Sequence, residues 1–359
     1  MAAERSIWRD KEYTSVVDNV RDGIQVIERE GFRIGSLIQQ NSPVNNELIR
    51  NPGLNDLYSY DMDGQMQIFP TVVREKNGGA EQVVSYVSFS YDDTADLEIL
   101  NKKGRFNITA YDRRVYNAVS TLYINGRSTV SLSEIFSVMT GYTRTNPTKS
   151  QLDSIERSLE KMKSVRVYID LTEEVRHKLI ADKQPLIDSG ILKDHSDRIK
   201  KAVMEDNMLH FRKGELVTEK GKVFKSIRLV AEPMLLTYNR AKKTLLTIPM
   251  EYIGLEGQNA TDKTIAFQDY LLMRIVSYRK KKMKENKVLY DTLYRDAGQE
   301  KPEDSKAFIR DRETVRKMME EWQRKGLIEG FDEIREGRSF VGIVFYTGDE
   351  QGTGQKQRG

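Results

Sequence analysis

The chain has 359 residues, of which 38% are hydrophobic and 31% charged, with a formal net charge of +4 and a pI near 8.8. This length predicts two or three domains, and so small a net charge does not by itself indicate a nucleic-acid partner. The absence of cysteine excludes disulfides and cysteine-ligated zinc. No apolar run reaches about 18 residues and the opening residues are too polar for a signal peptide, so we expect a cytoplasmic protein that does not enter a membrane.

Residues 1–104 are predicted to form an N-terminal extension. Residues 66–74 and 82–91 have the composition of strands, and Asn77-Gly78-Gly79 between them fits a turn, which predicts a small β-sheet with a hairpin. Two interpretations stay open: the extension serves as an arm for dimerisation, or it completes the domain that follows.

Residues 105–255 are predicted to form a first domain that begins with three helices. Apolar residues of the segment ITAYDRRVYNAVSTLYIN share one helical face. Ser131 with Glu134 and Thr148 with Gln151 form capping boxes that predict the starts of the second and third helices. Each helix start is thus set by local sequence.

Strands are predicted after these helices. VRVYIDL is rich in β-branched residues and predicts a strand directly after the third helix, which is the element order of a winged helix. Residues 172–207 are a charged insertion that we expect to be mostly helical. HFRKGEL, KVFKSIRLV and MLLTYNRAKKTLLTIPMEYI are then interpreted as strands of a wing and its sheet.

Residues 262–348 are predicted to form a second domain of the same order. A helix from Thr264 and the helix VLYDTLYRDA precede a third helix that begins at Asp311 as N-cap. Two apolar runs around Glu336-Gly337 then predict a hairpin. Residues 349–359 are expected to be a disordered tail. The predicted fold class is α+β: two tandem winged-helix domains with an N-terminal extension that contains a small β-sheet.

No catalytic pattern is present. His177, His195 and His210 do not have the spacing of metal ligands, and the chain contains neither a P-loop nor a Gly-x-Ser-x-Gly motif. We therefore expect a protein that is not an enzyme and that uses no cofactor or metal.

Basic residues indicate DNA contacts more strongly in the second domain than in the first. The candidate DNA-binding residues of the second domain are Arg279, Lys280, Lys281, Lys282, Arg310, Arg312, Arg316, Lys317, Arg335 and Arg338. The first group follows a helix end, where the helix dipole alone favours cations. The group from Arg310 to Lys317 exceeds what Glu313 and Glu320 can pair, and the last two residues flank the predicted wing tip.

The first domain has fewer candidates for DNA contact. They are Arg144, Lys149, Ser150, Arg157 and Lys161, on or just before the outward face of the third helix. Asp153 lies in the middle of that face and opposes tight phosphate contact. We therefore expect the first domain to bind DNA weakly, or to serve mainly in dimerisation.

The two domains and the segments ITAYDRRVYNAVSTLYIN and DRETVRKMMEEWQRKGLI resemble plasmid replication initiators of the iteron-binding Rep family. The resemblance covers residues 107–346. It implies sequence-specific binding of double-stranded DNA at direct repeats of an origin, by both domains and without catalysis. It also implies a homodimer that represses, a monomer that initiates, and recruitment of host helicase and initiator proteins.

Two other functions remain open from the sequence. A transcription regulator would combine one winged-helix reader with an N-terminal effector or dimerisation domain. An enzyme of nucleic-acid metabolism, or a relaxation accessory protein, would need a site that the motifs do not show. Two readers in one chain favour the initiator of a plasmid or mobile element, because regulators usually gain a second reader by dimerising.

Overall fold

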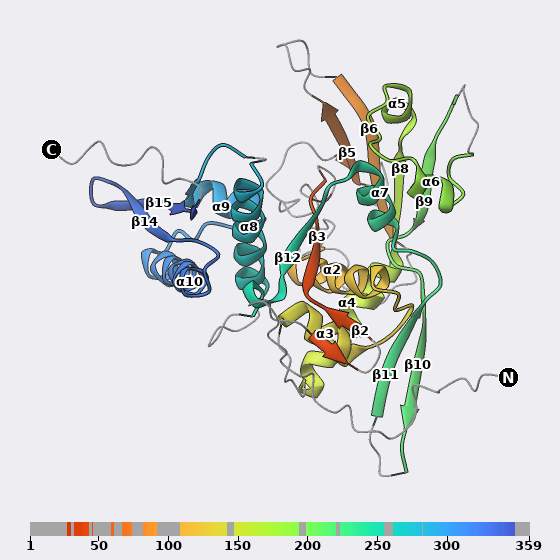
Figure 1. Ribbon diagram of the computed structural model, residues 1–359, viewed down its shortest axis with the longest axis horizontal. Coiled ribbons are helices and arrows are strands. Elements are labelled where there is room, and N and C mark those ends of the chain that lie inside the picture. Colours follow the sequence, from red (N-terminus) through yellow and green to blue (C-terminus); the bar gives the residue numbers. More distant parts are fainter. Residues whose placement is uncertain are drawn as a thin grey trace.

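The computed structural model describes residues 27–29, 32–42, 45, 59–60, 67–73, 82–91, 108–141, 147–193, 199–219, 223–254, 261–281 and 283–348. Over these residues the protein is mixed α+β, with small sheets in which every strand pairing is antiparallel (Figure 1). None of the helices in these ranges has the length and apolarity that crossing a membrane requires. The expected tail 349–359 and the turn at 77–79 lie outside the described residues.

Six elements make up what we call the first unit. They are α2 (Ala110–Ile124), β7 (Thr129–Ser131), α3 (Leu132–Thr140), α4 (Lys149–Ser164), β10 (Phe211–Val217) and β11 (Val223–Leu229). The strands form a sheet of order β10-β11-β7, so the short strand between the first two helices pairs with the last strand of the hairpin. In Figure 1 this hairpin extends away from the helices.

Six elements of the same kind make up the second unit. They are α8 (Asp262–Arg279), β13 (Lys287–Leu289), α9 (Tyr290–Asp296), α10 (Ser305–Arg324), β14 (Gly330–Glu336) and β15 (Ser339–Tyr346). The sheet order is β13-β15-β14, so the short strand again pairs with the last strand of the hairpin. The two units therefore share both element order and strand pairing.

The remaining elements form further sheets beside the first unit. A five-stranded sheet has the order β4 (Ser59–Tyr60), β5 (Gln67–Val73), β6 (Gln82–Tyr91), β8 (Val165–Asp170) and β9 (Val203–Asn207). Smaller pairings join β1 (Ile27–Arg29) to β2 (Phe32–Ile34) and β3 (Ser36–Gln40) to β12 (Leu245–Pro249). The short helices are α5 (Thr172–Arg176), α6 (Gln184–Asp188), α7 (Met234–Lys242) and the 3-10 turn η2 (Met250–Tyr252).

The hairpin predicted in the N-terminal extension is confirmed, because β5 pairs with β6. The strand VRVYIDL also forms, as β8, but its partners are β6 and β9 rather than the hairpin of the first unit. β8 and the N-terminal hairpin therefore belong to one sheet, and this sheet interrupts the first unit between α4 and β10.

The predicted helix starts at the capping boxes are confirmed. The Thr148 and Ser131 side chains accept hydrogen bonds from the backbone N–H groups of Gln151 and Glu134. Gly141 follows α3 with φ +69°, in the left-handed region where a Cβ would be strained. These signals are local, so neighbouring structure does not change them.

Three predictions about individual elements are wrong. The insertion 172–207 is not mostly helical: among its described residues only α5 and α6, of five residues each, are α-helices, and it ends in the strand β9. The segment 234–242 is the helix α7 rather than a strand, because a short apolar run buried nearly all round has no periodicity that separates helix from strand. Asp311 is not an N-cap: α10 begins at Ser305, and Asp304 caps it by accepting from the N–H groups of Lys306 and Ala307. The first turn of α10 is largely exposed, so it has no full apolar stripe that would reveal it.

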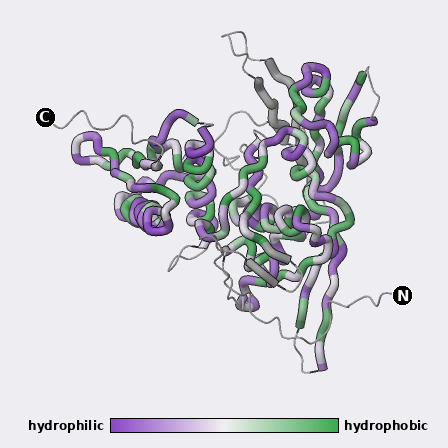
Figure 2. Tube along the Cα trace, viewed as in Figure 1, coloured by the Kyte–Doolittle hydropathy of each residue, from purple (hydrophilic) through white to green (hydrophobic). Residues whose placement is uncertain are grey.

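Buried apolar residues of both units belong to one continuous core. Leu122 and Val119 contribute from α2, and Leu271 and Ile275 from α8. Figure 2 shows that α10 is mostly hydrophilic along its length, consistent with a helix that buries one narrow face. The opposite face of α10 is available to a partner.

Candidate nucleic-acid interface

The face of α10 that turns away from the core carries cations. Val315, Met318, Met319 and Trp322 are buried at helical spacing and fix the orientation of the helix. Arg310, Arg316 and Lys317 are exposed. Because α10 begins at Ser305, these cations lie in the middle of the helix. The sequence predicts that they lie at the start of the helix, and this prediction is wrong.

Their electrostatic partners are few. Arg316 Nε lies 3.4 Å from Glu320 Oε1, with both side chains about half exposed, and such surface pairs add little stability. Arg310 and Lys317 form no side-chain ion pair with any residue that the structure describes. Arg310 and Lys317 are therefore free to approach a phosphate, and only a weak surface pair holds Arg316.

Arg312 has a different environment from its neighbours. Its Nε and Nη2 donate to Glu333 Oε1 and Oε2 of β14 at 2.5 and 2.6 Å. Its Cζ lies 3.2 Å from the centre of the Phe340 ring of β15. The hydrogen bonds from Arg312 hold the pKa of the Glu333 carboxyl below its ordinary value, although partial burial opposes them. Arg312 therefore joins α10 to its hairpin, whereas the sequence places it on the open face.

The turn of this hairpin presents further cations. Arg335 Cζ lies 4.2 Å from the Phe340 ring centre, while Arg338 is exposed beside Gly337, which has φ +60°. The register pairs Glu336 with Ser339, so both arginines lie at the tip as predicted. Both guanidinium groups lie at the exposed tip of the hairpin, where an anion can approach them.

The cations at the end of α8 form a separate patch. Arg279, Lys280 and Lys281 are exposed, and Arg279 Nη1 donates to the carbonyl of Leu327 at 3.5 Å. α10 ends at Arg324, seven residues beyond Lys317 (324 − 317 = 7), which is about 10.5 Å along the helix axis, and Leu327 follows that end. The structure therefore does not bring this patch together with the open face of α10. Lys282 lies outside the described residues.

In the first unit, as in the second, some candidate residues are exposed and others are paired within the protein. Lys149, Ser150 and Arg157 are exposed on α4. Lys161 is not: its Nζ lies 2.7 Å from Asp112 Oδ2, and its side chain is only 12% exposed. Arg144 lies outside the described residues.

The rest of the outward face of α4 contacts the hairpin rather than solvent. Lys225 Nζ donates to Glu156 Oε2 at 2.5 Å, and Lys213 Nζ donates to Glu156 Oε1 at 3.1 Å. Glu160 Oε1 lies 2.7 Å from Lys213 Nζ. Burial raises the pKa of Glu156, but the hydrogen bonds from Lys225 and Lys213 outweigh it and leave that pKa below its ordinary value. The face of α4 that contacts the hairpin is therefore acidic.

Two further arginines on the first hairpin are not among the candidates predicted from the sequence. Arg212 of β10 and Arg228 of β11 are directly opposite each other in the register, and both are exposed. Neither forms an ion pair with a described residue. They point away from the side that contacts α4, because side chains alternate along a strand and Lys213 points toward it. Only the register, which the sequence does not give, reveals this pair.

No group of three or more histidine, cysteine, aspartate or glutamate side chains suited to a metal occurs among the described residues. The chemical capacity of these surfaces is therefore ionic and hydrogen-bonding. Open guanidinium and ammonium groups on a helix, with more beside it on a hairpin, suit a polyanion such as a nucleic-acid backbone.

No protein-family model and no curated protein matches this chain. Two crystal structures of RctB domains 2 and 3 are similar to it in fold. One has 11% sequence identity and a TM-score of 0.41, covering 86% of this chain and 98% of that one. The other, a selenomethionine derivative, has 12% identity and a TM-score of 0.39, covering 84% and 95%. Similarity this distant defines neither a family nor a function for the chain.

Proposed function

We propose that the chain binds double-stranded DNA through two winged helices, the first and second units. The observation that carries the proposal is their shared topology: helix, short strand, two helices and a hairpin whose last strand pairs with the short strand. In a winged helix the third helix enters the major groove and the hairpin is the wing. By that correspondence, α4 and α10 are the recognition helices.

The charge distribution supports an unequal division between the units. α10 presents Arg310, Arg316 and Lys317 without a strong acidic partner. On α4 the exposed cations are Lys149 and Arg157, and the helix also carries acidic side chains that pair with lysines of the hairpin. We propose that the second unit supplies most of the affinity.

In its finer form, the proposal is a replication initiator of a plasmid or mobile element. It would bind direct repeats at an origin, form a homodimer, and recruit host helicase and initiator proteins without catalysing a reaction. Its support is the sequence resemblance described above together with the presence of two similar units in one chain. The alternative is a winged-helix transcription regulator.

The first test is DNA affinity as a function of salt. Binding of the full chain to a random-sequence duplex, followed by fluorescence anisotropy, should weaken about 10³ to 10⁵ fold between 50 and 200 mM salt if six to ten phosphates are contacted. Lys317→Ala should reduce the slope of log affinity against log salt by about 1. Lys200→Ala, an exposed cation outside both units, is the matched control and should leave the slope unchanged. A flat salt response of the unmodified chain would overturn the proposal.

A second test separates initiator from regulator. Duplexes are selected on the full chain from a random library, and the selected sequence is sought in the DNA around the gene. Directly repeated sites of about 20 base pairs, or two helical turns, support the initiator. A single palindromic site at a promoter would favour the regulator instead.

A further inference from the structure

A buried ion pair connects the two units. Arg114 of α2 approaches Asp269 of α8, with 2.6 Å between Nη2 and Oδ1, and both side chains are only 2% exposed. The same guanidinium donates to Gln268 Oε1 at 2.8 Å and to the carbonyl of Met139 at 3.0 Å. A charge buried this deeply is tolerated only while its partner stays in place. The pair therefore ties the position of α8 to that of α2.

A second contact joins the starts of the same two helices. Asp262, the first residue of α8, accepts a hydrogen bond from the backbone N–H of Tyr111 at 2.9 Å through Oδ1. Its other oxygen accepts from Gln299 Nε2 at 3.1 Å. The contacts of Arg114 and Tyr111 hold α2 and α8 together at two points. They restrain one helix from rotating or sliding against the other.

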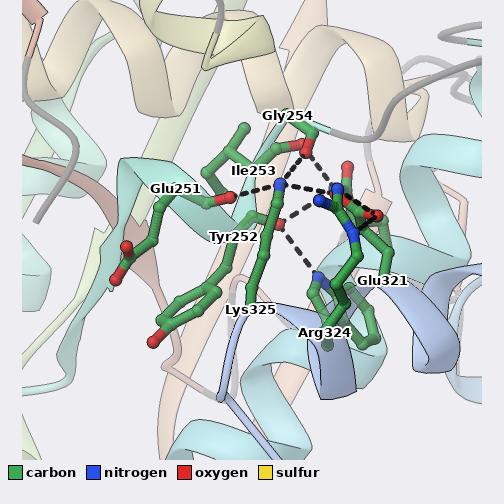
Figure 3. Close-up of polar contacts among 9 residues, drawn as sticks. Glu251, Tyr252, Ile253, Gly254, Glu321, Arg324 and Lys325 are labelled. Atoms are coloured by element: carbon green, nitrogen blue, oxygen red, sulfur yellow. Dashed lines mark hydrogen bonds and ion pairs between the residues drawn. The ribbon is translucent and has the colours of Figure 1, made fainter. Parts of the chain in front are cut away.

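Residues 250–254, the described part of the segment that leads to α8, are called the connector here and are held from the side of the second unit. Lys325, the C-cap of α10, donates to the carbonyls of Glu251 and Gly254 at 2.7 and 2.6 Å (Figure 3). The indole Nε1 of Trp322 donates to the carbonyl of Tyr252 at 3.0 Å. The connector backbone is therefore hydrogen-bonded to the end of the proposed recognition helix.

The first unit contacts the connector from another side. A Cβ on Gly141, which ends α3, would lie 2.8 Å from Gly254 N and 2.9 Å from the carbonyl oxygen of Met250. Only a glycine allows this close an approach of two backbones. Residues 250–254 are therefore packed between the ends of α3 and α10; residues 255–260, which complete the link to α8, lie outside the described residues.

We propose that the Arg114–Asp269 pair and the connector contacts fix the distance and rotation between two DNA contacts, so that the chain accepts a two-part duplex site with one spacer length only. This inference rests on the proposed function. Adding about 5 base pairs would turn one half-site to the opposite side of the duplex, and adding about 10 would move it by about 34 Å. Units joined by a flexible linker would tolerate the longer insertion; rigidly joined units tolerate neither.

The rigid connection can be measured without DNA. Because the chain has no cysteine, the double variant Val230→Cys/Leu289→Cys places one spin label on an exposed site of each side of the connector. Pulsed dipolar spectroscopy should give one narrow distance distribution. Asp269→Asn should broaden it, whereas Lys242→Met, which breaks a comparable partly buried pair with Glu174 outside the contact between the units, should not.

Lys325→Met serves as a second variant if Asp269→Asn does not fold, since Lys325 is partly exposed and its loss removes the connector contacts and one ion pair with Glu321 within the end of α10. It too should broaden the distribution. A broad distribution in the otherwise unmodified chain, or no change in either variant, would overturn the rigid connection.

The spacing rule is then tested on duplexes selected with the unmodified chain from a library of about 40 random base pairs. Insertion of about 5 or 10 base pairs between the half-sites should weaken binding about tenfold or more. In Asp269→Asn or Lys325→Met the penalty for the 10-base-pair insertion should shrink. Equal binding of the unmodified chain to the parent and the longer duplex would overturn the spacing rule. Failure to bind any duplex would overturn the proposed function while leaving the measured distance distribution intact.

Discussion

Glu156 and Arg312 occupy the same position in two helices and carry opposite charges. Each lies eight residues after its N-cap, since Thr148 caps α4 (148 + 8 = 156) and Asp304 caps α10 (304 + 8 = 312). Each pairs with the hairpin of its own unit, Glu156 with Lys225 and Arg312 with Glu333, at 2.5 Å. In each unit, one ion pair at the same helical position joins the third helix to the hairpin. The helix carries the acid in the first unit and the base in the second.

The buried positions confirm that the two helices are in the same register. Leu159 and Met162 of α4 and Val315 and Met318 of α10 are separated by the same 156 residues as Glu156 and Arg312, and all four are buried. The exchange of charge therefore places cations on the helix in the second unit and carboxylates on the helix in the first. The exchange concerns the side of each helix that contacts its hairpin, whereas the basic open surface of α10 comes from Arg310, Arg316 and Lys317.

The Arg312–Glu333 pair should stabilise the second unit. Arg312→Ala leaves a partly buried carboxylate without its two charged hydrogen bonds and should reduce the free energy of unfolding by about 1.5–3 kcal/mol. Arg316→Ala removes an exposed pair and should cost less than about 0.5 kcal/mol. Urea unfolding measures both. A double-mutant cycle with Glu333→Ala should show strong coupling for Arg312, and equal losses for the two arginines would contradict this assignment.

The same pair predicts a dependence of stability on pH. The pKa of Glu333 is lower in the folded chain than in the unfolded chain, so the unfolded state binds more protons as the pH falls. The contribution of Glu333 is therefore complete above its unfolded value of about 4.3 and is lost as the pH drops through the depressed folded value. The stability difference between the unmodified chain and Glu333→Gln should shrink below about pH 4. An undiminished difference in that range would show that the carboxylate charge is irrelevant.

Local signals explain which parts of the structure the sequence predicts. The capping boxes at Ser131 and Thr148 act over three residues, so helix starts follow from sequence alone. Glu333 is 21 residues from Arg312, and nothing local separates this partner from Glu313 or Glu320. The pair between Arg316 and Glu320, by contrast, joins residues four apart on one helix, a contact that follows from residue spacing alone.

Long-range strand pairing explains what the sequence does not predict. β8 has the composition of a strand, but its pairing with β6 joins residues far apart in the chain. The opposition of Arg212 and Arg228 likewise depends on the register of a hairpin. Residue types and spacing therefore predict the elements, while partners across elements require the fold.

Arg212 and Arg228 should affect stability and DNA affinity in opposite directions. Like charges directly opposite in a sheet repel, so Arg212→Gln should raise the free energy of unfolding by about 0.2–1 kcal/mol. If the pair contacts phosphate, the same change should weaken binding to a random duplex and lower the salt slope by about 1. Arg166→Gln, an exposed arginine of β8 that pairs with Glu205, is the control for general loss of charge. Unchanged affinity in Arg212→Gln would place this face outside the DNA contact.

Lys161 and Lys317 should separate structural from DNA-binding cations. Lys161→Met leaves the buried carboxylate of Asp112 without its ammonium partner, although Ser158 still donates to it at 2.7 Å. We expect a loss of stability of about 1–3 kcal/mol with no change in the salt slope. Lys317→Ala should lower the salt slope without a loss of stability, because its side chain is exposed. A lower salt slope in Lys161→Met would show that Lys161 contacts DNA.

Gly141 tests the packing of the connector, with Gly126 as a matched control. Both have positive φ, at +69° and +81°, so alanine should cost about 1–2 kcal/mol at either site through the backbone alone. A Cβ on Gly126 would meet nothing within 4 Å, whereas one on Gly141 would lie 2.8 Å from Gly254 N. Backbone atoms cannot rotate out of the way as side chains can, so Gly141→Ala must displace the connector as well. Its loss of stability in urea should exceed that of Gly126→Ala by about 1–3 kcal/mol, the range typical of overpacking. Equal losses would mean that the connector yields freely, which would argue against a rigid connection between the units.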